Sequence, residues 1–147
     1  MVNKPFSILN TVYRVVDMLA LLSIQKKIEL ISFVSPNCPT EVVGDDLRLQ
    51  QILVNLTSNA LKFTEKGWIK VSLRYDGVSE KDPRLGNFFL SVEDTGAGIP
   101  DSKKEVIFEK FTQLDSSLSR KTGGIGLGLA ISKVSKKQAK IVVNHVF

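Results

Sequence analysis

Hydrophobic positions recur at helical spacing in two stretches of the chain, and each stretch predicts a helix with one buried face. The first predicts a helix over residues 8–24. The second follows Asp45 and Asp46, whose carboxylates suit the amino-terminal cap of a helix. It predicts a helix over 46–63, after which Gly67 stops the helix.

Shorter stretches alternate between apolar and polar residues, as strands with one buried face do. Residues 29–35 predict a strand that ends in a proline-rich turn. Residues 68–75 and 87–93 predict two antiparallel strands joined by a charged loop over 76–86, and 141–147 can supply one more strand. We therefore expect helices and strands within one folded unit.

Composition and charge narrow the class of protein. The 147 residues, of which 43% are hydrophobic, suit one globular domain. No apolar run reaches the roughly 20 residues that span a bilayer, and no secretory leader is visible. The lone Cys38 suits a reducing compartment, so we expect a cytoplasmic domain. The net charge of +5 falls in residues 101–147, where it can attract an anionic ligand or simply form a solvated face.

Three polar residues share one face of the second predicted helix. Asn55 and Asn59 lie four residues apart, and Lys62 follows at a spacing of three. A carboxamide oxygen suits a magnesium ion that keeps most of its waters and shares phosphate oxygens, and an ammonium suits a phosphate. Taken alone, this pattern more often marks an ordinary polar helix surface.

The segment VEDTGAGIP, residues 92–100, ends a predicted strand with Asp94 and continues through Gly96 and Gly98. Glycines let the backbone pass close to a planar ligand, because no Cβ atom intervenes. A buried carboxylate accepts hydrogen bonds and suits an exocyclic amine such as that of adenine. Isolated runs of this kind are also common in turns and in calcium loops.

Two further motifs lie in an irregular, glycine-rich stretch between residues 94 and 128. IFEKFTQ carries Phe108 and Phe111, a spacing that alone more often fills a core than stacks on a base. GGIGLGLAIS is a glycine run that we expect to lead into a helix, whose free N–H groups and dipole hold phosphates. The dinucleotide-binding fingerprint is not met, because position 131 is Ile131.

Each motif is weak alone, but the four stand in one order, and each makes sense beside a magnesium nucleotide. They resemble the N, G1, F and G2 boxes of sensor histidine kinases, with RLQQILVNLTSNALKFTEKG, residues 48–67, as the N box. The resemblance covers about residues 5–133. It implies the carboxyl-terminal catalytic, ATP-binding domain of a two-component kinase, in the superfamily of gyrase, Hsp90, histidine kinases and MutL. The implied fold class is α+β, a Bergerat-type two-layer α/β sandwich with a mixed sheet and helices on one face.

Position by position, the resemblance also implies roles for residues around ATP and Mg²⁺. Asn59 resembles the magnesium ligand, Asn55 its catalytic neighbour, and Lys62 the residue that reaches the phosphates. Asp94 would read the adenine amine, and Gly96 would shape the adenine pocket. The other implied nucleotide-binding residues are Gly98, Phe108, Phe111, Gly124, Gly126, Leu127, Gly128 and Leu129.

The implied reaction is transfer of the γ-phosphate to a protein histidine rather than hydrolysis. Hydrolysing relatives carry a glutamate in place of Asn55, and a carboxamide cannot act as a base. In the family the acceptor histidine lies on a separate dimerisation domain, whereas the one histidine here, His145, lacks the flanking motif. We expect a monomer that cannot phosphorylate itself, whose partners are that domain and, indirectly, a receiver domain, with no nucleic acid or membrane contact.

The carboxyl end departs from the family pattern. We expect a single domain over residues 1–147, in which about 134–147 diverges, the final strand hairpin is missing and one sheet edge is open. This departure leaves a rival interpretation, a non-catalytic ATP-binding or docking module. A gyrase- or Hsp90-type ATPase is disfavoured by Asn55, and a nucleic-acid binder lacks an aromatic and basic stacking pattern.

Overall fold

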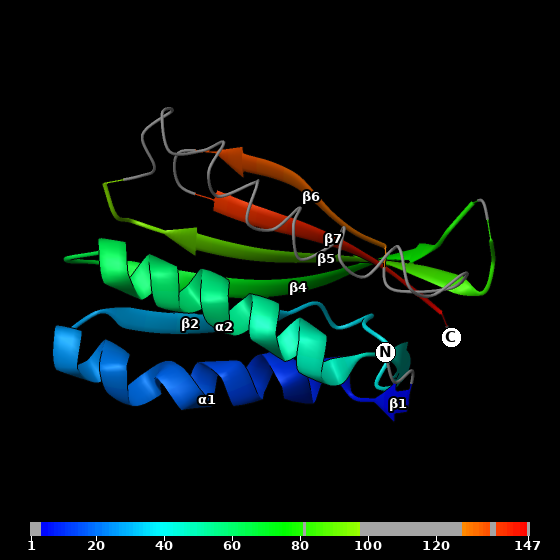
Figure 1. The fold of residues 1–147 in the computed structure, drawn as a ribbon, viewed down its shortest axis with the longest axis horizontal. Helices are drawn as coiled ribbons and strands as arrows, with labels where there is room; N and C mark the ends of the chain where they lie inside the picture. Colours follow the sequence, from blue (N-terminus) through cyan, green and yellow to red (C-terminus); the bar gives the residue numbers. More distant parts are fainter. Residues whose placement is uncertain (1–3, 81, 98–127, 136–137, 147) are drawn as a thin grey trace.

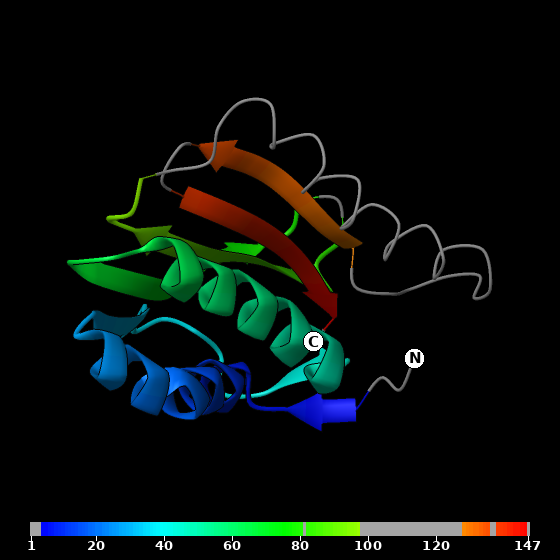
Figure 2. The ribbon, with the colours of Figure 1, turned by 60° about the vertical axis from the view of Figure 1, so that its left-hand side comes forward.

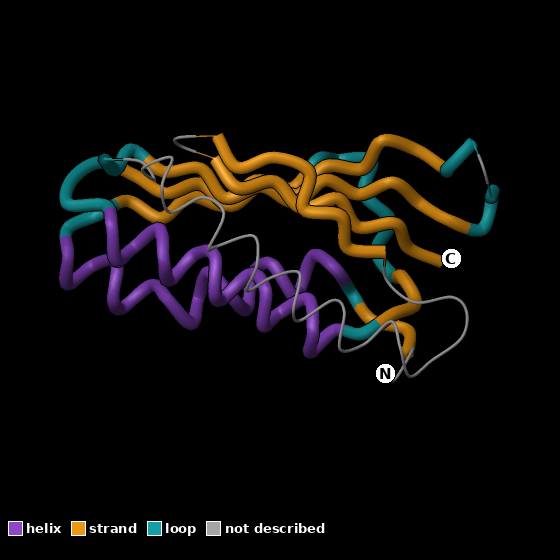
Figure 3. The backbone as a smooth tube through the Cα atoms, turned by 45° about the horizontal axis from the view of Figure 1, so that its top comes forward, coloured by secondary structure: helices purple, strands orange, loops and turns teal. Residues whose placement is uncertain are grey.

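Two helices cover one face of a mixed sheet and form a two-layer α+β sandwich (Figure 1 and Figure 3). The computed structural model describes residues 4–80, 82–97, 128–135 and 138–146, the last two ranges by their backbone alone. The fold class is the one that the resemblance implies. The helices are α1 (Ile8–Lys26) and α2 (Asp46–Phe63), and the strands are β1 (Lys4–Phe6), β2 (Glu29–Val34), β3 (Val42–Gly44), β4 (Trp68–Val78), β5 (Leu85–Asp94), β6 (Gly128–Ser135) and β7 (Gln138–Val146).

The strand order in the described sheet is β1-β3-β7-β5-β4-β2, and β6 also pairs with β7. β2 runs parallel to β4, whereas the other pairs are antiparallel. β7 lies inside the sheet, between β5 on one side and β6 on the other (Figure 2). β7, which follows the other described strands in the chain, is thus not an edge strand.

The hydrophobic core lies between the helices and the sheet. Helically spaced side chains such as Val12 and Val15 on α1, and Leu49 and Leu53 on α2, are completely buried. Burial of each such side chain contributes roughly 1.5–3 kcal/mol to folding. The sheet meets them with the alternate side chains of β4 and β5, which are Ile69, Val71, Leu73, Phe88, Leu90 and Val92.

Side chains of α1 tie it to α2 near both ends. Arg14 donates to the two carboxylate oxygens of Asp46 at 3.0 and 2.8 Å, and the Thr11 hydroxyl donates to the same carboxylate. At the other end the Lys26 ammonium donates to the main-chain carbonyl of Leu61 in the last turn of α2. Asp46 and Lys26 also complement the dipole of α2, since one is an anion at its first turn and the other a cation at its last.

Both predicted helices are confirmed. The helix expected over 8–24 is α1, which extends two residues further, and the helix expected over 46–63 is α2. Asp45 is the amino-terminal cap of α2, and its carboxylate accepts a hydrogen bond from the main-chain N–H of Arg48 at 3.0 Å.

The strands expected over 29–35, 68–75, 87–93 and 141–147 are also confirmed, as β2, β4, β5 and β7. The loop between β4 and β5 is shorter than expected, because β4 continues through a register shift between Tyr75 and Val78. The sequence does not predict β1 and β3. Each has only three residues, which is too short for an alternating pattern, and they pair with each other.

The prediction of a helix after the glycine run is wrong. Gly128–Ser135 is strand β6, which pairs with β7 from Gly128↔Asn144 to Ser135↔Gln138. The segment contains the β-branched residues Ile131 and Val134, which favour strands, and pairing with β7 satisfies its backbone groups. A carboxyl-terminal hairpin is therefore present, but its first strand comes from residues that the sequence pattern assigns to a helix.

α1 exposes apolar side chains on the face that turns away from the sheet. Partly for this reason, α1 has the length and composition of a membrane-crossing helix, and it is the one such helix in the described ranges. The core helix of a soluble domain meets the same criteria, and the other face of α1 is buried in the core. The exposed apolar residues are Tyr13, Met18, Leu21, Leu22 and Ile24.

A junction at Gly67 joins the starts of β2 and β4 to the end of β5. The Gly67 carbonyl accepts the N–H of Glu29 at 3.0 Å. The Thr95 hydroxyl accepts the N–H of Trp68 at 3.0 Å and lies 3.0 Å from the carbonyl of Lys66, to which it can donate. Gly67 has φ +108°, and a Cβ atom there would lie 2.1 Å from the Thr95 hydroxyl oxygen. Only glycine fits this position.

We predict that Gly67→Ala lowers the free energy of unfolding by about 3 kcal/mol, because backbone strain and overlap with Thr95 add together. Gly77→Ala is the matched control. Gly77 also has a positive φ, +82°, but a Cβ atom there would meet nothing within 4 Å. Its expected cost is about 1 kcal/mol. Urea unfolding of both variants measures the difference, and equal costs would contradict the steric role of Thr95.

Candidate functional site

The polar face predicted on α2 is present. Asn55, Asn59 and Lys62 are exposed, whereas Thr57 and Leu61, which lie between them in the sequence, are completely buried. Neither Asn55 nor Asn59 uses its carboxamide in a hydrogen bond to another described residue. Within the part of the chain that the structure describes, both carboxamides are therefore available to a ligand.

Asp94 lies at the end of β5 with one carboxylate oxygen held in place. Its Oδ1 accepts the main-chain N–H of Gly96 at 2.8 Å and lies 3.5 Å from the Thr64 hydroxyl. Its Oδ2 has no hydrogen-bond partner among the described residues. An ionised carboxylate has only acceptor sites, so Oδ2 is suited to an N–H donor from a ligand.

The turn after Asp94 packs against the end of α2. A Cβ atom on Gly96 would lie 2.7 Å from the Phe63 carbonyl oxygen and 3.0 Å from the Thr64 hydroxyl oxygen, so the two segments are in direct contact. The Lys62 ammonium lies 5.5 Å from the centre of the Phe63 ring, and this ring is 58% exposed. One end of the sandwich therefore carries a carboxylate, a cation and an exposed aromatic ring.

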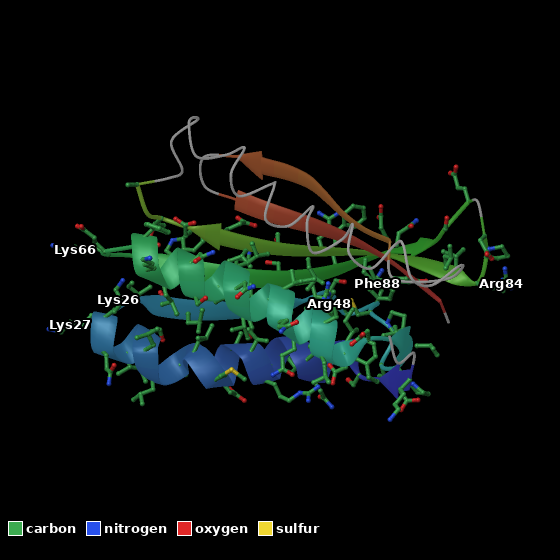
Figure 4. All side chains as sticks on the ribbon, in the orientation of Figure 1. Lys26, Lys27, Arg48, Lys66, Arg84 and Phe88 are labelled. Carbon is green, nitrogen blue, oxygen red and sulfur yellow. The ribbon has the colours of Figure 1, made fainter. Side chains whose placement is uncertain are left out.

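Further cations lie at this same end. Figure 4 shows Lys26, Lys27 and Lys66 where α1 and α2 finish and β4 begins. Together with Lys62 they favour an anionic ligand. Among the residues whose side chains are described, no group of three or more His, Cys, Asp or Glu could hold a metal ion. The exposed face of α2 instead offers the neutral carboxamide oxygens of Asn55 and Asn59. Such oxygens suit a Mg²⁺ ion that keeps most of its waters.

Several residues implied by the resemblance cannot be located at this site. Gly128 and Leu129 begin β6, and pairing through Asn144 brings Gly128 level with Asn87 on β5. Asn87 is seven residues before Asp94 on β5, which is about 24 Å along the strand by the rise per residue. The structure does not bring Gly128 and Leu129 to Asp94, and they have no helix N-terminus behind them. The residues outside the described ranges are Gly98, Phe108, Phe111, Gly124, Gly126 and Leu127.

The sequence motifs give no role to Thr64, Phe63 and Thr95, which the structure adds to the neighbourhood of Asp94. Thr64 and Phe63 stand inside the segment quoted as the N box, and Thr95 follows Asp94 directly. Their positions beside the motif residues are visible in the sequence. Their contacts depend on how the end of α2 meets the end of β5, which a linear pattern does not contain.

Comparison with known proteins identifies relatives over most of the chain. Residues 44–145 match the family model described as histidine kinase-, DNA gyrase B- and HSP90-like ATPase. The chain is 41% identical over 131 residues to the sensor protein GacS of Pseudomonas syringae, and 40% identical over 129 residues to the signal transduction histidine-protein kinase BarA of Escherichia coli K12. It is also 39% identical over 132 residues to the hybrid signal transduction histidine kinase A of Dictyostelium discoideum.

These alignments cover 88–89% of this chain but only 6–14% of each relative. Among solved structures, the catalytic domain of histidine kinase ThkA matches with a TM-score of 0.65 at 23% identity, over 99% of this chain and 97% of that one. At this identity, the likeness to ThkA concerns the fold alone. Full-length ShkA, solved in complex with AMPPNP, matches with a TM-score of 0.64 at 28% identity, over 97% of this chain and 30% of that one.

We predict that Gly96→Ala displaces the turn after Asp94 and lowers the free energy of unfolding by about 1–3 kcal/mol. The reason is the close approach of a new Cβ atom to the Phe63 carbonyl and to Asp94 Oδ1, at 2.7 and 2.8 Å. Ala97→Ser is the control, because Ala97 is exposed. Thermal unfolding and the backbone amide shifts of residues 94–97 give the result, and unchanged shifts in Gly96→Ala would refute this packing.

Proposed function

Because the chain belongs to the family of histidine kinase-, DNA gyrase B- and HSP90-like ATPases, we propose that it is the Mg-ATP-binding catalytic domain of a sensor histidine kinase. In this proposal it donates the γ-phosphate to a histidine on a separate dimerisation domain. One observation carries the proposal. The Asp94 carboxylate, whose Oδ2 has no hydrogen-bond partner among the described residues, lies beside the end of α2, and the exposed face of α2 bears Asn55, Asn59 and Lys62.

Adenine binds at Asp94 in this proposal. The 6-amino group donates to Oδ2, while Oδ1 stays with the N–H of Gly96. Gly96 packs so closely against the end of α2 that a Cβ atom would lie 2.7 Å from the Phe63 carbonyl oxygen, so a side chain does not fit there. The base therefore lies against the surface where β5 and α2 end.

The triphosphate extends from there along the exposed face of α2. Lys62 would contribute a positive charge to the phosphates, and Asn59 would supply a neutral oxygen ligand to Mg²⁺. When bound, Mg²⁺ neutralises charge on the phosphate oxygens. The glycine-run helix of the implied site is replaced by β6 in this structure, so no phosphate contact is assigned to a helix N-terminus there.

Transfer to histidine fits this face better than hydrolysis does. Phosphoryl transfer depends mainly on positioning and charge neutralisation. The bond between the γ-phosphorus and the β–γ bridging oxygen breaks, a bond to an imidazole nitrogen forms, and ADP leaves. Asn55 is exposed beside this reaction but cannot take a proton from water, so it orients groups without activating water.

The partners follow from the same proposal. The acceptor is a histidine-bearing dimerisation domain of the parent kinase, which passes the phosphoryl group to a receiver domain, and the site of action is the cytoplasm. Histidine kinase ThkA has been solved in complex with response regulator protein TrrA. The short share of each relative that this chain covers is consistent with one domain of a longer kinase.

A non-catalytic ATP-binding or docking module is the second candidate. It is favoured by the position of Gly128 and Leu129 at the opposite end of the sheet from Asp94. If that arrangement persists with nucleotide, the phosphates lack their glycine-rich contacts. Such a domain would bind ATP weakly and transfer nothing.

We predict that the chain binds ATP saturably and more tightly with Mg²⁺ than without it. Asp94→Asn weakens binding about 10–100-fold, because a charge-assisted hydrogen bond is lost. Asn59→Ala removes most of the gain in affinity from Mg²⁺. Gln51→Ala, an exposed substitution one turn before Asn55 on the same helix, leaves affinity unchanged. Isothermal titration calorimetry with and without Mg²⁺ measures all four proteins.

Transfer is then tested with γ-labelled ATP and a separately produced histidine-bearing dimerisation domain, beside a variant of that domain in which the histidine is glutamine. Label on the histidine-bearing domain and not on its glutamine variant supports the proposed kinase function. Binding without label supports the docking module. A folded chain that binds no ATP contradicts the proposed function.

A further inference from the structure

Thr64, the first residue after α2, has a buried hydroxyl beside Asp94. The residue is 0% exposed, and its Oγ1 lies 3.5 Å from Asp94 Oδ1, its hydrogen-bond partner within the described residues. A buried hydroxyl without a partner destabilises a protein. The carboxylate therefore satisfies Thr64, and Thr64 in turn restrains the carboxylate.

Thr57 on the same helix provides an internal comparison. It is also 0% exposed, but its Oγ1 has no hydrogen-bond partner. It lies two turns before Thr64 on α2. Two threonines of equal burial thus differ in whether the hydroxyl contacts Asp94.

Two donors converge on the same carboxylate oxygen. Gly96 N–H contacts Asp94 Oδ1 at 2.8 Å, and the Thr64 hydroxyl approaches it from the end of α2. Gly96 also packs directly against Thr64, because an added Cβ atom on Gly96 would lie only 3.0 Å from Thr64 Oγ1. With Oδ1 held from two directions, rotation of the carboxylate is limited and Oδ2 keeps one orientation.

We propose that Thr64 is a positioning residue that orients Asp94 and so determines selection of a 6-amino purine over a 6-oxo purine. This inference rests on the proposed function. A 6-amino group donates to Oδ2, whereas a 6-oxo group presents a second acceptor to a carboxylate and is rejected. Rejection requires that Oδ2 cannot turn away. Without the Thr64 hydroxyl, Gly96 is the one described residue that holds Oδ1, and the carboxylate can rotate to relieve the repulsion.

The test compares ATP with ITP, which carries a 6-oxo group in place of the 6-amino group. The variants are Thr64→Val, which removes the hydroxyl at equal size, Thr64→Ser, which keeps it, and Thr57→Val as the control. We expect Thr64→Val to narrow the ratio of ATP to ITP affinity about tenfold. Thr64→Ser restores the ratio, and Thr57→Val leaves it unchanged. Thr64→Ala is the second variant without a hydroxyl if Thr64→Val fails to fold.

A structural role and a positioning role give different results. If Thr64→Val weakens ATP and ITP equally, Thr64 only supports the fold and the inference is overturned. In an Asp94→Asn background, Thr64→Val is expected to leave the ratio unchanged, because the group that it orients is no longer a carboxylate. A further tenfold change in that background would also overturn it.

Different results would refute the role of Thr64 and the proposed function. A folded wild-type chain that binds neither nucleotide refutes both. A wild-type chain that prefers ATP, with the same preference in Thr64→Val, refutes the role of Thr64 alone and leaves the nucleotide site in place.

Discussion

The site depends on the contact between the end of α2 and the end of β5. At this point Gly67 adopts a backbone conformation with positive φ and leaves room for the Thr95 side chain, and Gly96 approaches the last carbonyl of α2. The hydrogen bonds of Thr95 then join the loop after α2 to the start of β4. Because these contacts are steric as well as polar, they fix the position of the Asp94 carboxylate relative to the end of α2.

The pairing of α1 with α2 extends this constraint. Arg14 holds Asp46 at the first turn of α2, and Lys26 holds a carbonyl in its last turn. Exposed ion pairs contribute little to stability. Here their effect is geometric, since two contacts near opposite ends of a helix limit both its sliding and its rotation. The face that carries Asn55 and Asn59 is thereby kept at a constant angle to the sheet.

Much of this architecture could be predicted from periodicity. Val12, Val15, Leu49 and Leu53 mark buried helix faces in the sequence, and both helices are present as expected. The three polar residues of α2 share an exposed face because spacings of three and four require it. The segment from Gly128 could not be assigned in this way. Its spacing fits a helix, whereas its pairing with β7 depends on a partner that local preferences do not include. Thr64 was missed for a similar reason, since its contact with Asp94 joins residues 30 positions apart.

The place of β7 in the sheet has a consequence for how the domain acquires its structure. β7 follows all the other described strands in the chain, yet it pairs with β5 along nine residues and also contacts β3 and β6. During translation the helices and β2, β4 and β5 can assemble first, while one side of β5 stays unpaired. An unpaired strand side in a nascent chain is exposed to association with other chains. Pairing with β7 then covers this side of β5, so β7 protects a strand that precedes it in the chain.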